Sequence, residues 1–358
     1  MQYNQLTLNG ETSKGIALKQ KAIAKIADPT IPTWEKNIWL FVEAWLNDSS
    51  EIVLKTSGST GIAKTIVVNK QNMVNSALMT GTYFGFEANQ VALLCLSAEY
   101  IAGKMMIVRA LVWGLNLWTV EPSKNPLQAL STTINIDFVA MVPLQVAESL
   151  KDTHSQAIFQ RIKTTIIGGA PIPKTLQIQI QAGANKCYAT FGMTETLSHV
   201  AIQVLNGPCA DGYYYGLKNV KLLMDKRGCL VIDAPHLHEE KLITNDLVVF
   251  KNPDVFRFLG RYDNLVNSGG VKLIPEVLEA KIAGLLSEAY FFIGEKDKAL
   301  GERLVLVIES ETWNAEKQAQ FQEALKAVLG KYECPKAIYF KPIFERTPTG
   351  KVRRVLGS

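Results

Sequence analysis

The sequence lacks the cysteine pairs and long apolar runs that define several protein classes. Its five cysteines are odd in number and never form a C-x-x-C pair. This pattern argues against a disulfide framework or a zinc site and is typical of reduced thiols in a cytoplasm. The most apolar stretch, residues 105–118, contains Arg109 and is too short to span a bilayer.

Targeting and nucleic-acid signals are also missing. The first ten residues contain no basic segment followed by an apolar one, as a signal peptide would. The net charge of +5 is small, and no RNA- or DNA-binding module is recognisable. We therefore expect a cytoplasmic protein that neither inserts into membranes nor binds nucleic acid.

The chain length predicts more than one folding unit. A chain of 358 residues, 47% hydrophobic and 20% charged, is typical of a globular protein with two domains. We place a large domain at 1–262 and a small one at 263–358, with the boundary near Asp263.

The first two thirds of the chain alternate short apolar runs with helical patterns. Strands are predicted near 51–55, 91–96, 137–142, 164–167 and 187–191, and helices near 34–46, 101–113, 144–150 and 176–183. Such alternation predicts an α/β domain built on a mostly parallel sheet. Loops at the carboxyl ends of parallel strands form the ligand crevice, and glycine-rich segments follow the first, fourth and fifth of these strands.

The last third has a different pattern. Residues 218–235 predict antiparallel strands around a turn at Asp225–Gly228. Helices near 275–286 and 315–332, with strands near 289–295, 303–309 and 337–342, then predict a small α+β domain.

One glycine-rich loop has an ambiguous phosphate-binding pattern. Residues 58–65 read G-S-T-G-I-A-K-T, in which Ala63 replaces the second glycine of a Walker A loop. Its backbone amides, its hydroxyls and Lys64 can still surround phosphate oxygens. By itself the segment is equally compatible with a polar surface loop.

Five motifs together carry a clear resemblance. They are T-S-G-S-T-G-I-A-K at 56–64, G-G-A-P-I-P at 168–173, F-G-M-T-E-T at 191–196, the segment 260–279, and T-P-T-G-K at 347–351. Their order resembles that of the adenylate-forming acyl-CoA synthetases. Residues 140–150 and the short chain are most similar to the o-succinylbenzoate–CoA ligase branch of menaquinone biosynthesis.

The resemblance implies a fold and a reaction. The fold is a large α/β domain, truncated at its N-terminus relative to the family, followed by a small mobile α+β lid. The reaction joins a carboxylate to ATP, releases pyrophosphate, and then transfers the acyl group from the adenylate to CoA. ATP, Mg²⁺ and CoA are the implied small-molecule partners, and homo-oligomerisation is left open.

The resemblance also assigns the nucleotide site residue by residue. The phosphate loop supplies Thr56, Ser57, Gly58, Ser59, Thr60, Gly61 and Lys64. Glu195 matches the Mg²⁺ ligand, beside Thr194, which donates to phosphate. The adenine lies between Phe191–Gly192 and the strand edge Gly168, Gly169, Ala170 and Pro171. Asp246 and Arg261 match the ribose contacts, although Asn245 replaces the expected glycine before Asp246.

Other motif residues are implied to act during catalysis. Lys351 matches the lysine that reaches the carboxylate and the α-phosphate, where it neutralises developing charge. Asp263 matches the hinge about which the small domain turns, and Gly269 and Gly270 match the channel for the thiol arm of CoA.

The acyl pocket follows from the same alignment and from substrate chemistry. A pocket for o-succinylbenzoate needs apolar walls and donors for the second carboxylate, which is not activated. The candidates are Tyr100, Lys104, Arg109, Thr196, Ser198 and His199. Tyr100 stands where many relatives have a histidine.

Three alternatives remain at this point. The protein could ligate another aryl or short acyl acid to CoA, or it could be a non-catalytic nucleotide-binding relative. A Walker-type ATPase is the third alternative and would release ADP instead of AMP.

Overall fold

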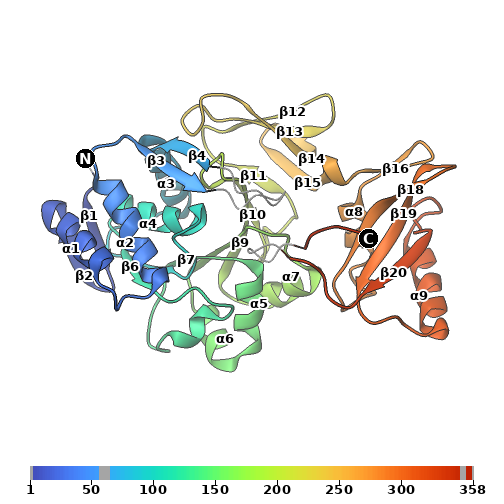
Figure 1. Ribbon diagram of the computed structural model, residues 1–358, viewed down its shortest axis with the longest axis horizontal. Helices are drawn as coiled ribbons and strands as arrows, with labels where there is room; N and C mark the ends of the chain where they lie inside the picture. Colours follow the sequence, from blue (N-terminus) through green and yellow to red (C-terminus); the bar gives the residue numbers. More distant parts are fainter. Residues whose placement is uncertain (1–2, 56–64, 347–351, 357–358) are drawn as a thin grey trace. The chain divides into compact units, whose positions relative to one another are not determined.

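The computed structural model describes residues 3–55, 65–346 and 352–356 (Figure 1). The chain divides into two units, which we describe separately. The first comprises Met1–Ile172, Leu176–Lys221 and Asp233–Leu242, and the second comprises Pro173–Thr175, Leu222–Ile232 and Ile243–Ser358. The expected domain boundary near Asp263 stays a prediction.

A parallel sheet forms the centre of the first unit. Its order is β11-β10-β9-β8-β7-β5-β6-β1-β2. The run from β9 to β1 is parallel, whereas β2, β10 and β11 join antiparallel at the two ends. The strands are β1 (Gln5–Leu8), β2 (Glu11–Lys14), β5 (Val91–Leu94), β6 (Asn116–Thr119), β7 (Phe138–Met141), β8 (Thr164–Ile167), β9 (Lys186–Gly192), β10 (His199–Val204) and β11 (Tyr214–Gly216).

Helices cover both faces of this sheet, as the near-continuous apolar strands require. Phe138 and Ala140 of β7 pack in a core with α1 to α4, whereas Val139 and Met141 pack in a second core with α5, α6 and α7. The helices are α1 (Gly15–Ala27), α2 (Thr33–Leu46), α3 (Lys70–Phe84), α4 (Ile101–Trp113), α5 (Pro143–Lys151), α6 (Thr153–Phe159) and α7 (Lys174–Gln181), with a 3₁₀ turn η1 (Pro126–Ala129). The four predicted helices of this region are confirmed. Within the described part of the chain, no helix is both long and apolar enough to cross a membrane.

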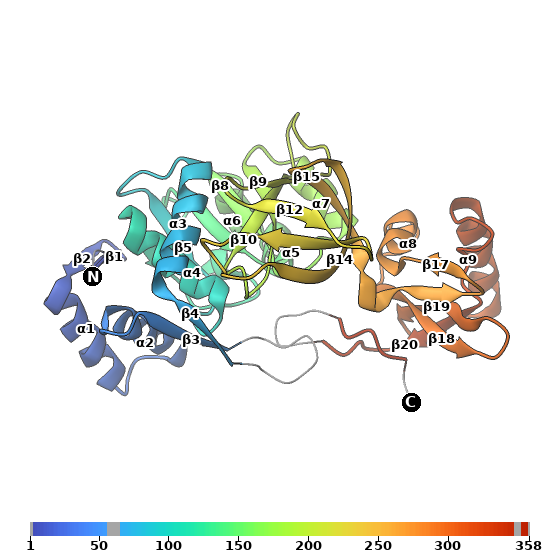
Figure 2. The same ribbon diagram turned by 90° about the horizontal axis from the view of Figure 1, so that it is seen from above.

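The strand before the phosphate loop does not belong to the parallel sheet, contrary to the prediction. β3 (Glu51–Lys55) pairs antiparallel with β4 (Thr65–Asn69) over its whole length, from Glu51↔Asn69 to Lys55↔Thr65 (Figure 2). A parallel partner would need a crossover of a dozen or more residues, and the chain returns sooner than that. β4 was not predicted, and only its first residue, Thr65, was considered, as the end of the phosphate-loop pattern.

The second unit contains two groups of strands. β12 (Lys221–Met224), β13 (Cys229–Asp233), β14 (Leu242–Asn252) and β15 (Val255–Arg261) are neighbours in this order, and η2 (Tyr262–Asn264) follows. The other group is β16 (Val266–Ser268), β17 (Val271–Leu273), β18 (Tyr290–Asp297), β19 (Gly301–Glu309) and β20 (Ala337–Lys341), with helices α8 (Pro275–Ile282) and α9 (Ala315–Val328). β19 lies between β16 and β18 and also pairs with β20. The α+β pattern predicted for this region is confirmed.

Candidate functional site

The ends of β8 and β9 bring two predicted nucleotide motifs together. The strands are parallel neighbours with Ile167 opposite Ala189, so Gly168 lies beside Thr190, the residue before Phe191. A Cβ on Gly168 would lie 2.2 Å from Thr190 Oγ1, which shows how closely the two segments approach. The Phe191 ring meets Tyr214 edge to face at 5.7 Å, and its face is therefore oriented by a second aromatic ring.

A tight turn after β9 carries Thr194 and Glu195. Thr196 Oγ1 accepts from the Met193 N–H at 2.9 Å and lies 2.7 Å from the Ser198 carbonyl oxygen. A Cβ on Gly192 would lie 2.2 Å from that same oxygen, so only glycine permits this approach. Buried Leu197 has a left-handed φ of 65°, a strained conformation for a branched residue. Glu195 is exposed on this turn. The hydroxyl of Thr196, in contrast, forms its hydrogen bonds with the backbone of the turn.

A buried hydrogen-bond chain links α4, β10 and α3. Arg109 Nη2 donates to Ser198 Oγ at 2.6 Å, and this oxygen lies 3.2 Å from His199 Nδ1. His199 Nε2 lies 3.3 Å from Thr80 Oγ1, and the Thr80 hydroxyl donates to the carbonyl of Ser76 at 3.1 Å. Sequence reasoning named the first three residues but missed Thr80, for which it had no signal.

The chain determines the protonation of His199. Because Arg109 can only donate, the hydroxyl of Ser198 is free to donate to Nδ1, and Nε2–H then donates to Thr80. Burial, and secondly the charge of Arg109, lowers the pKa of His199 well below its usual value. The imidazole is therefore neutral, and it accepts a hydrogen bond at Nδ1 and donates one from Nε2.

A neutral buried His199 predicts a pH-dependent stability. Below about pH 6.5 the imidazole of His199 is protonated in the unfolded chain but not in the folded protein. Its contribution to the free energy of unfolding is therefore complete above pH 6.5 and is lost as the pH falls. On the acid side, His199 should make the free energy of unfolding fall by up to about 1.4 kcal/mol per pH unit, and we expect His199→Gln to remove this part of the slope. Urea unfolding between pH 7.5 and 5.5 measures it, with His238→Gln at a partly exposed histidine as the control. An identical slope in His199→Gln and the unsubstituted protein would contradict the assignment.

Arg109 is a buried cation whose hydrogen bonds are incomplete. The residue is 1% exposed, and burial lowers its pKa to about 9. Its Nε has no hydrogen-bond partner, and no carboxylate of the described residues lies within 4 Å of the guanidinium. Such a group is destabilising unless an anion or a further acceptor binds it.

The remaining acyl-pocket candidates lie near the start of α4. Tyr100 is the residue preceding the first turn of the helix, and Lys104 Nζ donates to the carbonyl of Glu99. The structure thus brings Arg109, Ser198 and His199 into direct contact, whereas Lys104 binds the backbone at the opposite end of the helix.

The second unit brings the predicted ribose and hinge residues together. Asp246 and Arg261 are register partners on β14 and β15, and Arg261 Nη1 donates to Asp246 Oδ1 at 2.9 Å. Arg261 Nη2 also donates to Asp263 at 3.1 Å. Asn245 Nδ2 donates to both oxygens of Asp263, at 3.0 and 3.2 Å, and its oxygen accepts from Arg227 at 2.9 Å. The sequence drew attention to Asn245 because it replaces the glycine expected before Asp246. Nothing in the sequence pointed to Arg227 as its partner.

The glycine pair at 269–270 forms a hairpin turn. β16 and β17 are joined by Gly269 and Gly270 alone, with φ of 59° and 85°. Two consecutive positive φ values are what a two-residue type I′ turn requires, so the turn by itself explains both glycines. Their role in a CoA channel stays a prediction.

Two parts of the predicted site, the phosphate loop 56–64 and Lys351, lie outside the described residues.

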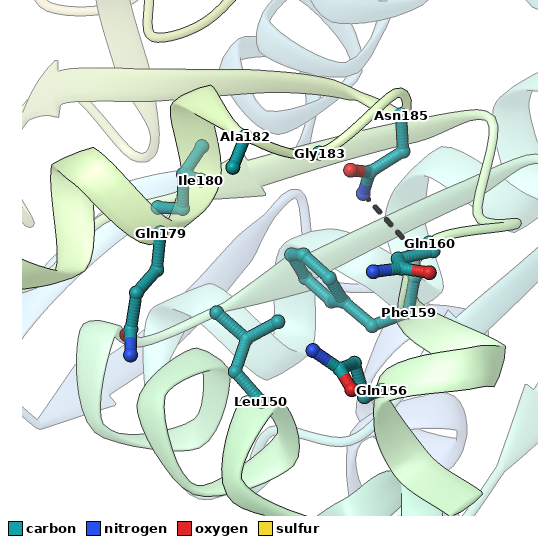
Figure 3. Close-up of a pocket in the computed structure, with 9 residues that line it drawn as sticks. All are labelled: Leu150, Gln156, Phe159, Gln160, Gln179, Ile180, Ala182, Gly183 and Asn185. Carbon is teal, nitrogen blue, oxygen red and sulfur yellow. Dashed lines mark hydrogen bonds between the residues drawn. The ribbon is translucent and has the colours of Figure 1, made fainter. Parts of the chain in front are cut away.

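A hollow between α5, α6 and α7 contains none of the predicted site residues (Figure 3). It is lined by Leu150, Gln156, Phe159, Gln160, Gln179, Ile180, Ala182, Gly183 and Asn185. Over the described residues, no three acidic, histidine or cysteine side chains gather as a metal site.

Comparisons with known proteins identify related sequences and structures. The family described as AMP-binding enzyme matches residues 21–227. A solved acyl-CoA synthetase (AMP-forming)/AMP-acid ligase II-like protein from Dyadobacter fermentans is 36% identical, with a TM-score of 0.64, over 94% of this chain and 96% of that one.

Two further relatives carry more specific names. A 2-succinylbenzoate--CoA ligase of Listeria monocytogenes is 24% identical over 94% of this chain and 76% of its own length. The o-succinylbenzoate coenzyme A synthetase of Bacillus subtilis, solved with ATP and a magnesium ion, is 19% identical with a TM-score of 0.66, over 84% of this chain and 68% of that one. The chain has the α/β fold of the AMP-forming ligases and belongs to the family of AMP-binding enzymes.

Proposed function

We propose that the protein joins o-succinylbenzoate to CoA through an acyl-adenylate, with release of pyrophosphate and AMP. The observation that carries the acid's identity is the buried, incompletely bonded guanidinium of Arg109. A monocarboxylic acid would have its only carboxylate consumed by adenylation, whereas o-succinylbenzoate retains a second one. The name of the Listeria relative supports the same substrate.

The acyl pocket in this proposal is arranged around the second carboxylate. The Nε–H of Arg109 has no partner, and Nη1 donates only to the sulfur of Met106 at 3.5 Å, so the guanidinium can still donate to a carboxylate. Ser198 accepts from Nη2 and thereby fixes the plane of the guanidinium. The neutral ring of His199 adds no second positive charge, so one anion suffices to balance the site.

The adenylation step in this proposal uses the residues that the family resemblance assigns to it. Ser57, Ser59, Thr60 and Lys64 hold the β- and γ-phosphates, and Phe191 covers the adenine. Asp246 and Arg261 bind the ribose hydroxyls, and Lys351 neutralises charge as the carboxylate attacks the α-phosphate.

The exposed carboxylate of Glu195 suits Mg²⁺. This ion commonly takes one or two protein carboxylates and completes its shell with phosphate oxygens and water. When bound, it withdraws charge from the triphosphate. Thr194 on the same turn donates to a phosphate oxygen.

Removing the carboxylate of Glu195 tests this assignment. We expect Glu195→Gln to raise the Mg²⁺ concentration for half-maximal pyrophosphate release about 10- to 100-fold, because a neutral amide binds the ion weakly. A Mg²⁺ titration measures it, with Glu87→Gln at an exposed carboxylate of the same unit as control. Unchanged Mg²⁺ dependence in Glu195→Gln would refute the role.

The decisive experiment identifies products. The purified protein is incubated with ATP, Mg²⁺, CoA and o-succinylbenzoate, and the mixture is analysed by mass spectrometry. AMP together with the acyl-CoA of the expected mass is the result that the proposal requires. AMP formation only with other acids would retain the ligase but reject this substrate, and ADP would reject the adenylation chemistry.

A further inference from the structure

The hollow between α5, α6 and α7 contains a buried hydrogen-bond acceptor that the described residues leave unused. Asn185, the residue before β9, is 6% exposed, and its Nδ2 donates to the carbonyl of Phe159 at 3.0 Å. Because a carbonyl oxygen can only accept, this bond fixes which end of the Asn185 amide is the oxygen. That oxygen, Oδ1, is buried, accepts from none of the described residues and points into the hollow (Figure 3). A buried oxygen without a donor is destabilising, so a ligand that donates to it is bound favourably.

The wall beside this oxygen is fixed and leaves the oxygen accessible. Asn206 Nδ2 donates to the carbonyls of Gly183 and Asn185, at 3.3 and 2.6 Å, and thereby holds the turn between α7 and β9. A Cβ on Gly183 would lie 3.1 Å from Asn185 Oδ1. Gly183 does not have a positive φ, so its backbone conformation does not require glycine. What the glycine provides is space beside the unused oxygen.

The floor of the hollow is apolar. Phe159 and Ile180 are 2% and 1% exposed, and Leu150 is half-buried. In Figure 3 the ring of Phe159 lies at the centre of the lining residues, with the side chain of Leu150 below it. An aromatic ring in the hollow would therefore contact an aromatic and an aliphatic side chain together.

The size and the charge of the hollow restrict what it can bind. Its volume is about 200 Å³, compared with about 30 Å³ for one water and about 150 Å³ for a cavity that binds benzene. None of its lining residues is ionisable, and the rim carries the carboxamides of Gln156, Gln160 and Gln179. An ion would find no opposite charge here, whereas a small neutral ring would find both apolar contacts and hydrogen bonds.

We propose that this hollow binds a neutral aromatic molecule of one ring or two fused rings that carries an N–H or O–H group. The donor forms a hydrogen bond with Asn185 Oδ1, the ring packs against Phe159 and Leu150, and the rim carboxamides contact its outer edge. The site contains none of the residues assigned to ATP, the acid or CoA. The proposal is therefore independent of the proposed function.

Two matched probes test the hydrogen bond. 5-Fluoroindole has a ring N–H, whereas 5-fluoro-1-methylindole has a methyl group in its place, and fluorine NMR of the probe measures the binding of each. We expect 5-fluoroindole to bind the full chain with a Kd of about 0.1–1 mM, as is typical of a ligand with so few atoms. The methylated probe should bind at least about 10-fold more weakly, because it leaves Oδ1 without a donor. Equal binding of the two probes would overturn the proposal, and binding of neither would show that the hollow holds only water.

A substitution at the rim tests the location of the bound probe. Ala182 is an exposed lining residue, and we expect Ala182→Trp to fill the hollow and abolish binding of 5-fluoroindole. Gln181→Trp is the matched control, because it adds the same side chain at an exposed neighbour outside the lining and should leave binding unchanged. If Ala182→Trp does not fold, Gln160→Trp at another exposed rim residue is subject to the same criterion. Undiminished binding in the filled variant would place the probe elsewhere and overturn the proposal.

Discussion

Replacing Arg109 by methionine is expected to raise the KM for o-succinylbenzoate about 30- to 1000-fold, because it removes a buried charge partner of the second carboxylate. The KM for ATP is expected to remain within about twofold, since no nucleotide contact is assigned to α4. Steady-state pyrophosphate release at varied acid and ATP concentrations measures both values.

The same substitution has an opposite effect on stability. The guanidinium is desolvated without a carboxylate among the described residues, and methionine fills a similar volume without a charge. We expect the free energy of unfolding to rise by about 1–4 kcal/mol, as when buried ions are replaced by apolar side chains. A gain in stability together with a loss of acid binding is the pattern of a residue retained for function.

Arg161→Met, at an exposed arginine of the same unit, is the control and should change neither quantity. If Arg109→Met destabilises the protein and leaves the acid KM unchanged, Arg109 is structural. The acid pocket must then be sought elsewhere, and the choice of o-succinylbenzoate loses its main support.

Lys351→Ala is expected to lower kcat for adenylate formation about 100- to 1000-fold, the effect of removing one preorganised charge stabiliser. A carboxylate that attacks a triphosphate brings negative charges together, and a lysine ammonium offsets this only in the transition state. Because the loss is in the transition state, kcat should fall far more than KM changes. ATP–pyrophosphate exchange measures it.

The second half-reaction discriminates between roles for this lysine. CoA should still convert prepared acyl-adenylate at a rate within about threefold of normal, because attack of a thiolate on a mixed anhydride needs no charge at the departed pyrophosphate. Lys331→Ala, at an exposed lysine of the same unit, should leave both half-reactions unchanged. Loss of both half-reactions in Lys351→Ala would mean that the residue acts on structure or on nucleotide binding.

The alternation of elements was predictable because it depends on local patterns. The apolar runs of β7 and β8 and the glycine-ended helix α4 have periodicities that short segments display by themselves. The prediction that β3 belongs to the parallel sheet was wrong, because the pairing of a strand depends on which other strand is close enough in the chain to pair with it. β4 follows so soon in the chain that an antiparallel ribbon forms instead.

The motifs of the candidate site were readable for the same reason. Each motif places its reactive groups within a few consecutive residues, as in T-S-G-S-T-G and F-G-M-T-E-T. Asn245 was visible as a departure from the family pattern, but its contacts with Asp263 and Arg227 were not, since those partners lie eighteen positions away on either side.

The sequence by itself determined the family, the order of its motifs and the residue types available for adenylation, because these are properties of short, contiguous segments. Only the tertiary structure decided which side chains, far apart in the sequence, form an ion pair or a hydrogen bond with one another. Ser198 lies 89 positions from Arg109, Thr80 lies 119 from His199, and Glu279 lies 75 from Arg354. A buried ion or imidazole takes its protonation and its partner from everything that packs around it, and that packing exists only in the folded chain.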